Sequence, residues 1–412
     1  MRHRISPHIT DAQASYQRHL GGYLQHSPYR EQVGRPGVVD LAFGDPHEFP
    51  SPDLVSLLQN GLEPRHPEWF AYLRDHQPAQ SAIARSLSVD PGMPFMPEDV
   101  ALTNGAFAGL MVCLRTLAAP GEEVIHLAPS WFYYEPMIAS VGAVPVQVAL
   151  RPGSWRPDVD RIAAALTPAT SVVVINSPNN PTGVVYSDDE LRDLAAALRR
   201  ASERHGRPIY VVSDESYRKI VFERARCPSM AEHYPYTLLV HTYTKTLMLP
   251  GERVGYVALP PTMPDREPLR RALDVAQLMT GWAYPNNSLL YALPDLERLA
   301  PRLGPLRARR DRLVTALRDL DYAVQPCEGT FYLLVAAPDG DDWGHAATLA
   351  EHGVLVLPGS VMGAPGYFRV ALTATDAMLS TAVARLPLAK TAAQPQPDPA
   401  LGPPAASTRR AP

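Results

Sequence analysis

Five apolar runs rich in β-branched residues occupy the middle of the chain, and they constrain the fold more than any other feature. Several of them do not alternate apolar with polar residues, which is expected for strands covered on both faces, as in a parallel sheet. Helix-like segments separate the runs. The predicted strands are 124–127, 172–176, 209–213, 238–242 and 254–259. The sequence therefore predicts an α/β fold in which helices pack on a mostly parallel sheet.

One helix between two of these strands can be predicted in detail. Ser187 and Glu190 have the spacing of a capping box, in which each side chain bonds the backbone N–H of the other residue. Apolar residues then recur on one helical face. They are Leu191, Leu194, Ala195 and Leu198. We expect a helix that begins after Ser187.

The end of the chain differs from its middle. From about residue 296, Arg-rich helical segments are followed by short strands at 330–335 and 367–371, which predicts a second, smaller domain. A chain of 412 residues fits this division because it is too long for one small core. Six prolines lie between Pro395 and Pro412 among Ala, Gln and Ser, a composition with little to bury. We expect 389–412 to be a disordered tail.

Charge and composition exclude several classes of protein. The 38 basic and 42 acidic residues give a net charge of -4 without a dense basic stripe, so nucleic acid is not an expected partner. Neither a signal peptide nor a stretch of membrane-span length is visible. Cys113, Cys227 and Cys327 are scattered, with no Cys-x-x-Cys or Cys/His metal spacing. This pattern favours a reducing compartment, the cytoplasm, and argues against a metal site or a disulfide scaffold.

A turn rich in small residues follows another short apolar strand. In Leu102-Thr103-Asn104-Gly105-Ala106-Phe107, a strand ends in a Gly turn and a helix of Ala, Leu, Met and Val begins. Free N–H groups at a helix N-terminus favour an anion, and a glycine lets the backbone approach it closely. The turn is a candidate phosphate cradle. An ordinary strand-to-helix connection would show the same pattern.

Asp214 comes directly after the strand 209–213, where ligands of open α/β sheets usually bind. A carboxylate buried there needs a cation, a metal or a hydrogen-bond donor as partner, and a protonated pyridinium nitrogen would serve. Tyr217, three residues later, could reach the same ligand. Alternatively, Asp214 caps a helix or ends a strand, and Tyr217 only packs.

Lys245 is one of few lysines in an Arg-rich chain, and it lies between threonines directly after a strand. A partly desolvated lysine has a lowered pKa and offers a nucleophilic amine. Arg253, which precedes the strand 254–259, could clamp a phosphate. The alternatives are a surface lysine and an arginine in a surface salt bridge.

In this order, the motifs resemble those of the fold-type I pyridoxal phosphate enzymes, specifically the class I/II aminotransferase family that includes aspartate aminotransferase. The cofactor of that family needs an amine, a carboxylate for its ring nitrogen, and cations with hydroxyls for its phosphate. The matching segments are Leu41-Ala42-Phe43-Gly44, Pro129-Ser130-Trp131, Asn180-Pro181-Thr182-Gly183, Asp214-Glu215-Ser216-Tyr217, Thr242-Tyr243-Thr244-Lys245, Arg253 and Phe368-Arg369-Val370.

The resemblance implies a role for each matched residue. Lys245 would form a Schiff base with pyridoxal 5'-phosphate and then shuttle a proton at the substrate α-carbon, with Asp214 and Tyr217 as its catalytic partners. Asp214 would keep the ring nitrogen protonated, and Arg369 would bind the substrate carboxylate. The other implied cofactor residues are Gly105, Ala106, Phe107, Trp131, Asn180, Tyr217, Thr242, Thr244 and Arg253. The other implied substrate residues are Gly44, Trp131 and Asn180.

The resemblance also implies an architecture. The expected fold is a large domain with a mostly parallel seven-stranded sheet, plus a smaller α+β domain. The implied division is an N-terminal segment 1–45 that packs on the small domain or on a partner subunit, a large domain 46–295, a small domain 296–388 and the tail. A homodimer with active sites at the subunit interface is implied as well.

Two departures from the family pattern concern the partner subunit and the substrate. The family often presents a tyrosine to the partner's phosphate, and here Phe70 or Tyr72 falls near that position. Members specific for dicarboxylates use a second arginine, which the segment 280–286 lacks. Trp282 and Tyr284 in that segment fit either an apolar or aromatic substrate pocket or the core.

The expected function is therefore transamination between an L-amino acid and a 2-oxo acid. The main alternative is a lyase, a replacement enzyme or an amino acid oxidase of the same fold, because fold and cofactor do not fix which bond breaks. A pyridoxal phosphate-binding transcription regulator is a further alternative. Only about forty residues precede Gly44, which is too little for an additional DNA-binding domain.

Overall fold

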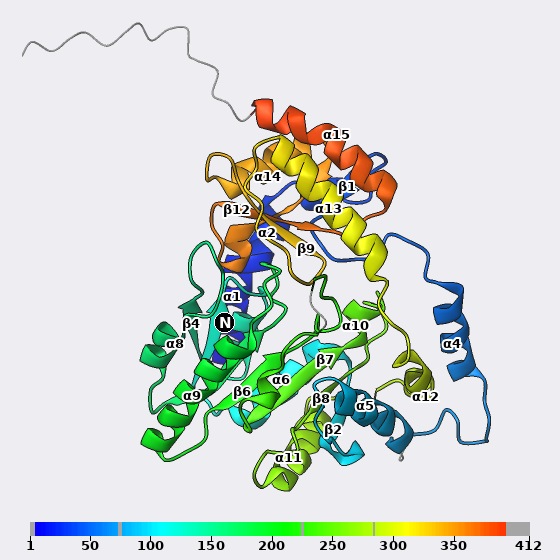
Figure 1. The fold of residues 1–412 in the computed structure, drawn as a ribbon, viewed down its shortest axis with the longest axis vertical. Helices are drawn as coiled ribbons and strands as arrows, with labels where there is room; N and C mark the ends of the chain where they lie inside the picture. The colour runs from blue at the N-terminus through cyan, green and yellow to red at the C-terminus, as the bar shows by residue number, and fades with distance from the viewer. Residues whose placement is uncertain (1–4, 73–75, 224–225, 283–284, 393–412) are drawn as a thin grey trace, which may run out of the picture.

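A seven-stranded sheet forms from the apolar runs of the middle of the chain (Figure 1). The computed structural model describes residues 5–72, 76–223, 226–282 and 285–392. In spatial order the strands are β2 (Val100–Thr103), β8 (Gly255–Ala258), β7 (Thr237–Thr242), β6 (Tyr210–Asp214), β5 (Thr170–Asn176), β3 (Glu123–Ala128) and β4 (Val144–Ala149). In this sheet β8 runs in the direction opposite to the other six strands. The predicted mostly parallel sheet and its five central strands are confirmed.

Helices cover both faces of this sheet, as the uninterrupted apolar runs require. On β5, Val172 and Val174 pack with the helix α6 (Gly105–Leu117), while Val173 and Ile175 pack with α9 (Asp188–His205). The two sets alternate because successive side chains of a strand point to opposite faces. The remaining helices of this part are α4 (Pro52–Leu62), α5 (Gln77–Val89), α7 (Tyr134–Ser140), α8 (Val159–Ala165), α10 (Tyr243–Thr246), α11 (Arg266–Met279) and α12 (Asn287–Leu296).

The capping box predicted at Ser187 is present. Ser187 accepts a hydrogen bond from the backbone N–H of Glu190, and the Glu190 carboxylate accepts one from the N–H of Ser187. The face of α9 that carries Leu191, Leu194 and Leu198 is buried against the sheet. Capping and amphipathicity therefore fix where this helix begins and how it packs.

A second, three-stranded antiparallel sheet lies in the upper part of the molecule in Figure 1. Its strands, in order, are β11 (Leu357–Pro358), β12 (Tyr367–Ala371) and β9 (Tyr332–Ala336). The helices α13 (Leu303–Asp319), α14 (Asp342–Glu351) and α15 (Asp376–Ala392) pack against it around a separate apolar core. The strands predicted at 330–335 and 367–371 are confirmed, with β9 beginning two residues later than predicted.

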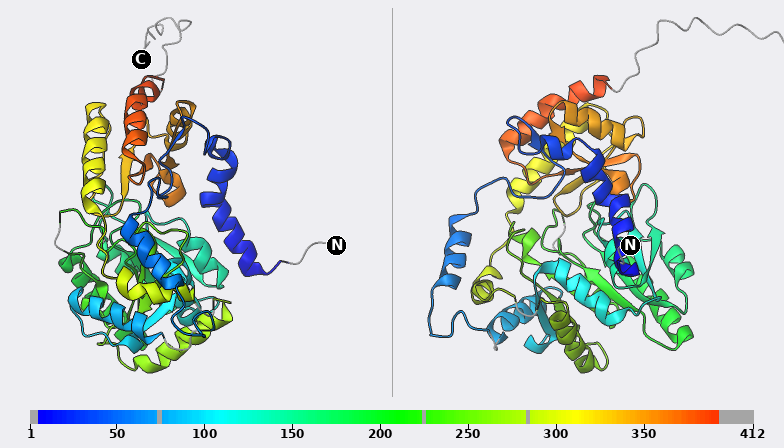
Figure 2. Two further views of the ribbon diagram at one scale, coloured as in Figure 1. Left: turned by 90° about the vertical axis from the view of Figure 1, so that its right-hand side faces the viewer. Right: turned by 180° about the vertical axis from the view of Figure 1, so that it is seen from behind.

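The N-terminal residues connect the two parts. The sequence alone indicated no element here, yet α1 (Pro7–Tyr16), α2 (Gly22–His26) and α3 (Tyr29–Gln32) form along one side of the molecule (Figure 2). The helix α1 packs on α7, and the short strand β1 (Val39–Asp40) pairs in parallel with β10 (Val354–Leu355). The N-terminal segment thus contacts both the large and the small sheet regions.

The remaining expectations concern membrane spans, metal sites, the cysteines and the C-terminal tail. No helix within the described ranges is long and apolar enough to cross a membrane. No group of three His, Cys, Asp or Glu side chains that could hold a metal occurs in the same ranges. Cys113, Cys227 and Cys327 are all buried and unpaired. The predicted tail begins too early, because residues 389–392 belong to a helix (376–392) in which Ala389 is fully buried. The rest of it, from residue 393 onwards, lies outside the described residues.

Candidate active site

A cavity lies at the carboxyl ends of the parallel strands, where it also meets the small sheet. Strand register places Asn176, at the end of β5, directly opposite Asp214, at the end of β6. Most of the residues singled out in the sequence line this cavity. They are Gly44, Ala106, Phe107, Trp131, Asp214, Tyr217, Thr242, Thr244, Lys245, Arg253 and Arg369. Gly105 and Asn180 are not part of the lining, but each contacts a residue that is.

Lys245 reaches the cavity from α10, the short helix that follows β7. Its Nζ lies 5.9 Å from the centre of the Tyr217 ring and 5.7 Å from that of Phe331. No hydrogen bond or ion pair to this amine occurs in the part of the chain that the structure describes. Lys245 is half-buried, and its amine faces the cavity over aromatic rings without a direct ion pair. Burial raises the pKa of the nearby Asp214 carboxyl, and the charge of Lys245 opposes that shift.

Asp214 is buried at the end of β6, and both of its carboxylate oxygens accept hydrogen bonds. Tyr134 Oη donates to Oδ2 at 2.6 Å, and Ser216 Oγ donates to Oδ1 at 2.5 Å. Burial raises the pKa of the Asp214 carboxyl, and the bonds from Ser216 and Tyr134 oppose that shift. Oδ1 also accepts from the backbone N–H of Ser216 at 3.1 Å, so Oδ2 is the oxygen that keeps a lone pair for a donor from a ligand.

Gly105, two threonines and Arg253 form a cradle at the N-terminus of α6. Gly105 has φ +76°, and a Cβ there would lie 3.0 Å from Nη2 of Arg253 and 3.6 Å from Oγ1 of Thr242. Thr242 Oγ1 donates to Thr244 Oγ1 at 2.8 Å, and Arg253 Nη1 lies 3.4 Å from Thr244 Oγ1. Hydroxyls, a guanidinium and free helix N–H groups are donors, so the cradle suits an anion such as phosphate.

Aromatic rings form one wall of the cavity. Trp131 meets Phe107 edge to face, with ring centres 5.3 Å apart, and it meets Tyr134 in the same way at 5.7 Å. Both Trp131 and Phe107 line the cavity. These contacts fix the indole, so a planar ligand could pack against it.

Arg369 is buried on β12 and is held by neutral groups. Its Nη1 donates to Oδ1 of Asn180 at 2.9 Å, and its Nη2 donates to the carbonyl of Ala42 at 2.7 Å. Its guanidinium carbon lies 3.9 Å from the centre of the Tyr332 ring. The Nε is buried and has no partner, and no acidic side chain of the described residues forms an ion pair with the group. Two of the five N–H donors of the guanidinium are used by these bonds, so the others can bind a ligand carboxylate.

Gly44 lies where two aromatic residues approach the backbone. A Cβ at this position would lie 2.3 Å from Cε2 of Phe331 and 2.5 Å from Oη of Tyr332. Atoms of real side chains do not come this close, so only a glycine fits here without rearrangement. Gly44 therefore allows Tyr332 to cover the Arg369 guanidinium.

Tyr134 and Tyr332 also belong to the site, although the sequence did not indicate them. Tyr134 stands in the aromatic run 131–134, and Tyr332 begins a strand predicted only as part of the small domain. Neither position has a local pattern that distinguishes a ligand-facing tyrosine from a packing one. Their bonds and contacts to Asp214 and Arg369 join residues far apart in the chain, and so appear only in the folded structure.

Three of the four residues considered for the substrate or for a partner do not line this cavity. Phe70 and Tyr72 are 65% and 82% exposed, on the surface near α4 and α12. The Trp282 carbonyl accepts a hydrogen bond from Gln277, and its side chain is absent from the lining. Tyr284 lies outside the described residues. Phe70 and Tyr72 are accessible for contacts with another subunit.

Similarity to known proteins extends over most of the chain. The sequence profile of the family described as aminotransferase class I and II matches residues 36–386. A Thermus aquaticus protein named probable aspartate/prephenate aminotransferase is 32% identical over 377 residues, covering 86% of this chain and 92% of that protein. The Escherichia coli methionine aminotransferase is 31% identical over 334 residues, 77% of this chain and 83% of its own.

A crystal structure of an aminotransferase from Eubacterium rectale superimposes on this chain with a TM-score of 0.84 at 27% identity. The match covers 92% of this chain and 98% of the other. The two curated relatives differ in the amino acid for which they are named, although their identities to this chain are nearly equal.

Proposed function

The chain belongs to the class I and II aminotransferases, and we propose that its cavity binds pyridoxal 5'-phosphate and moves an amino group between an L-amino acid and a 2-oxo acid. The observation that carries this proposal is the Lys245 amine. It opens into the same cavity as the buried Asp214 carboxylate and the anion cradle, and it has no ion-pair partner among the described residues.

The residues around the cavity fit the cofactor group by group. Gly105, Thr242, Thr244 and Arg253 would hold the phosphate, together with the free N–H groups of Ala106 and Phe107. The remaining lone pair of Asp214 Oδ2 would hold a proton on the ring nitrogen. When bound, pyridoxal phosphate supplies an electron-withdrawing ring that draws electrons from the substrate α-carbon.

The chain's own side chains would then position and move protons. Lys245 would bond the cofactor through its amine and, once released, would move the proton at the substrate α-carbon. Burial raises the pKa of the Tyr217 hydroxyl, and the neighbouring Tyr332 raises it further. Tyr217 therefore stays protonated and can donate a hydrogen bond. The Nδ2 of Asn180 can donate as well, because Oδ1 is the atom bonded to Arg369. Trp131 would pack on the ring.

Substrate binding would depend on Arg369. Its free Nε and its Nη groups suit a bidentate bond to the α-carboxylate, which every amino acid carries. Gly44 adds a backbone contact at the same end of the cavity. The segment 280–286 has no arginine to bind a second carboxylate, so we infer that it does not supply the recognition used by dicarboxylate-specific enzymes.

The proposal extends to the assembly. We propose a cytoplasmic homodimer in which the exposed Phe70 and Tyr72 contact the other subunit. We also propose a large domain 46–295 and a small domain 296–388, with the N-terminal segment 1–45 connecting them. The pairing of β1 with β10 and the packing of α1 on α7 support that connecting role.

The test is the visible absorbance of the purified protein, recorded before and after the addition of single amino acids without a keto acid. A cofactor band that disappears with an amino acid and returns with a 2-oxo acid supports transamination. A panel of acidic, apolar and aromatic amino acids would name the substrate class. Release of ammonia or peroxide would instead indicate a lyase or an oxidase.

Lys245→Ala isolates the residue on which the proposal rests. The chain has only three lysines, and Lys390 on α15, which pairs with Asp321, provides a matched control. We expect Lys245→Ala to lose the covalent cofactor band and Lys390→Ala to keep it. A Lys245→Ala protein with an unchanged band would contradict the assignment.

A further inference from the structure

A chain of hydrogen bonds outside the cavity ends at Arg369. Ala42, whose carbonyl accepts from Arg369, donates its own N–H to Oδ1 of Asp40 at 2.9 Å. The other carboxylate oxygen of Asp40 accepts from the hydroxyl of Tyr29 at 2.8 Å. Tyr29, Asp40 and Ala42 therefore connect the N-terminal segment to the guanidinium.

The backbone next to Ala42 is held by hydrogen bonds of Leu41 to two other segments, in addition to the bond with Asp40. The N–H of Leu41 donates to the Leu355 carbonyl, and the Leu41 carbonyl accepts from the N–H of Ala371, both at 2.8 Å. The Leu41 carbonyl and the Ala42 N–H belong to one planar peptide, so the bonds of Ala371 and Asp40 hold that peptide at both ends and place the Cα of Ala42, which carries the carbonyl. An aspartate that bonds the N–H two residues later holds the backbone in a defined turn.

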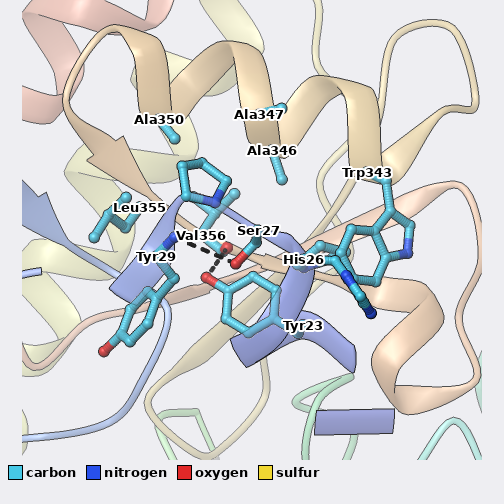
Figure 3. A pocket seen from close by; sticks show the side chains of 12 residues that line it. Tyr23, His26, Ser27, Tyr29, Trp343, Ala346, Ala347, Ala350, Leu355 and Val356 are labelled. Atoms are coloured by element: carbon cyan, nitrogen blue, oxygen red, sulfur yellow. Dashed lines mark hydrogen bonds between the residues drawn. The ribbon is translucent and has the colours of Figure 1, made fainter. Parts of the chain in front are cut away.

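The rings around Tyr29 hold its hydroxyl on Asp40. Figure 3 shows Tyr29 beside Tyr23 in a pocket between the N-terminal helices and α14. The two ring centres are 5.5 Å apart, and Phe43, which lines the cavity, meets Tyr29 edge to face at 5.2 Å. Tyr23 donates its hydroxyl to the Val356 carbonyl instead, so it is a neighbour outside the chain of bonds to Arg369.

We propose that Asp40 and Tyr29 are positioning residues that aim the Arg369 guanidinium by fixing the Ala42 carbonyl. Among the described residues, the Arg369 group makes two hydrogen bonds, both to neutral acceptors, so a shift of one acceptor changes its direction. A bidentate bond to a carboxylate depends on that direction. The inference rests on the proposed function, because the carboxylate in question is that of the amino acid substrate.

The test compares four variants of the holoenzyme. Asp40→Ala removes both acceptors, Tyr29→Phe removes only the hydroxyl, and Asp40→Asn removes the charge but keeps the acceptor for the Ala42 N–H. Tyr23→Phe is the matched control, because the same atom is lost from the same segment. The readouts are the dissociation constant of an amino acid and the limiting rate of its half-reaction, both from the cofactor absorbance.

Asp40→Ala should raise the dissociation constant by roughly five- to tenfold, the effect of one ordinary hydrogen bond, with little change of the limiting rate. Tyr29→Phe should raise it by about twofold or threefold. The dissociation constants of Asp40→Asn and Tyr23→Phe should stay near that of the wild type. If Asp40→Asn resembles Asp40→Ala, the charge and not the bond matters, and the proposal is wrong.

A crystal structure of Asp40→Ala provides a readout that does not depend on activity. The proposal predicts that the bond between Arg369 Nη2 and the Ala42 carbonyl is lengthened or lost. An unchanged bond, or a substrate affinity equal to that of Tyr23→Phe, would overturn it. A wild-type protein without a cofactor band would refute the proposed function, and the crystal structure would still decide whether Asp40 positions Arg369.

Discussion

Replacing Gly44 by alanine should force apart two aromatic residues at the substrate end of the cavity. The added Cβ would lie 2.3 Å from Phe331 and 2.5 Å from the Tyr332 hydroxyl, whereas carbon atoms in contact are usually about 3.5–4.0 Å apart. Phe331 is fully buried, and Tyr332, which is 3% exposed, could move only toward the cavity that it lines. The rings also pack on each other, with centres 4.9 Å apart.

The size of the effect follows from this geometry. Overpacking of a buried site destabilises proteins by about 1–3 kcal/mol. With an unfolding entropy of about 2 cal/mol/K per residue, this lowers the thermal midpoint by roughly 1–4 °C if the chain unfolds as one unit. Tyr332 covers the Arg369 guanidinium at 3.9 Å, so its displacement should also weaken the binding of amino acids.

Thermal unfolding and amino acid titration of the same Gly44→Ala protein would measure both effects. Gly304→Ala is a suitable control, because Gly304 lies in α13 and a Cβ there meets no atom within 4 Å. Alanine favours helix over glycine by up to about 1 kcal/mol, so this control should not melt earlier than the wild type. A Gly44→Ala protein that melts and binds like the wild type would refute the reasoning.

Two further substitutions address the cofactor side of the cavity. Tyr134→Phe removes a donor that stabilises the Asp214 carboxylate, so the pKa of Asp214, already raised by burial, should rise further. The acidic limb of kcat/KM against pH should then move to higher pH, and an unmoved limb would count against this role. Gly105→Ala places a Cβ 3.0 Å from Arg253 at a backbone φ of +76°, which is unfavourable for alanine by about 1–2 kcal/mol. Titration of the apoprotein with pyridoxal phosphate should show weaker binding, and an equal affinity would mean that the cradle does not hold the phosphate.

Local sequence patterns were enough to predict the central strands and one helix. The runs that became β5, β6 and β7 are apolar throughout, and the capping box at Ser187 satisfies backbone groups within four residues. The edge strand β4 was missed, because its partly exposed residues give no continuous apolar run. The strands β1, β10 and β11 have two residues each, and they form only because distant segments pair with them.

The helices before residue 45 could not be predicted from local sequence patterns either. The residues of α1 have no strong apolar face, and the helix is held by its packing on α7, more than 100 residues away. Strand pairing then holds β1 against β10. A contact between distant segments has no signal in either segment alone, so sequence reasoning could not find these elements.

The sequence by itself determined the parallel sheet, the order of the motifs, and a set of candidate residues that includes Lys245, Asp214 and Arg369, because residue type and local spacing carry that information. Only the tertiary structure decided how these groups face one another. Arg369 meets Asn180 across 189 positions of sequence, and Tyr134 meets Asp214 across 80. Such pairs arise from the packing of the two sheets and from strand register, which fix directions and distances that a linear pattern does not contain.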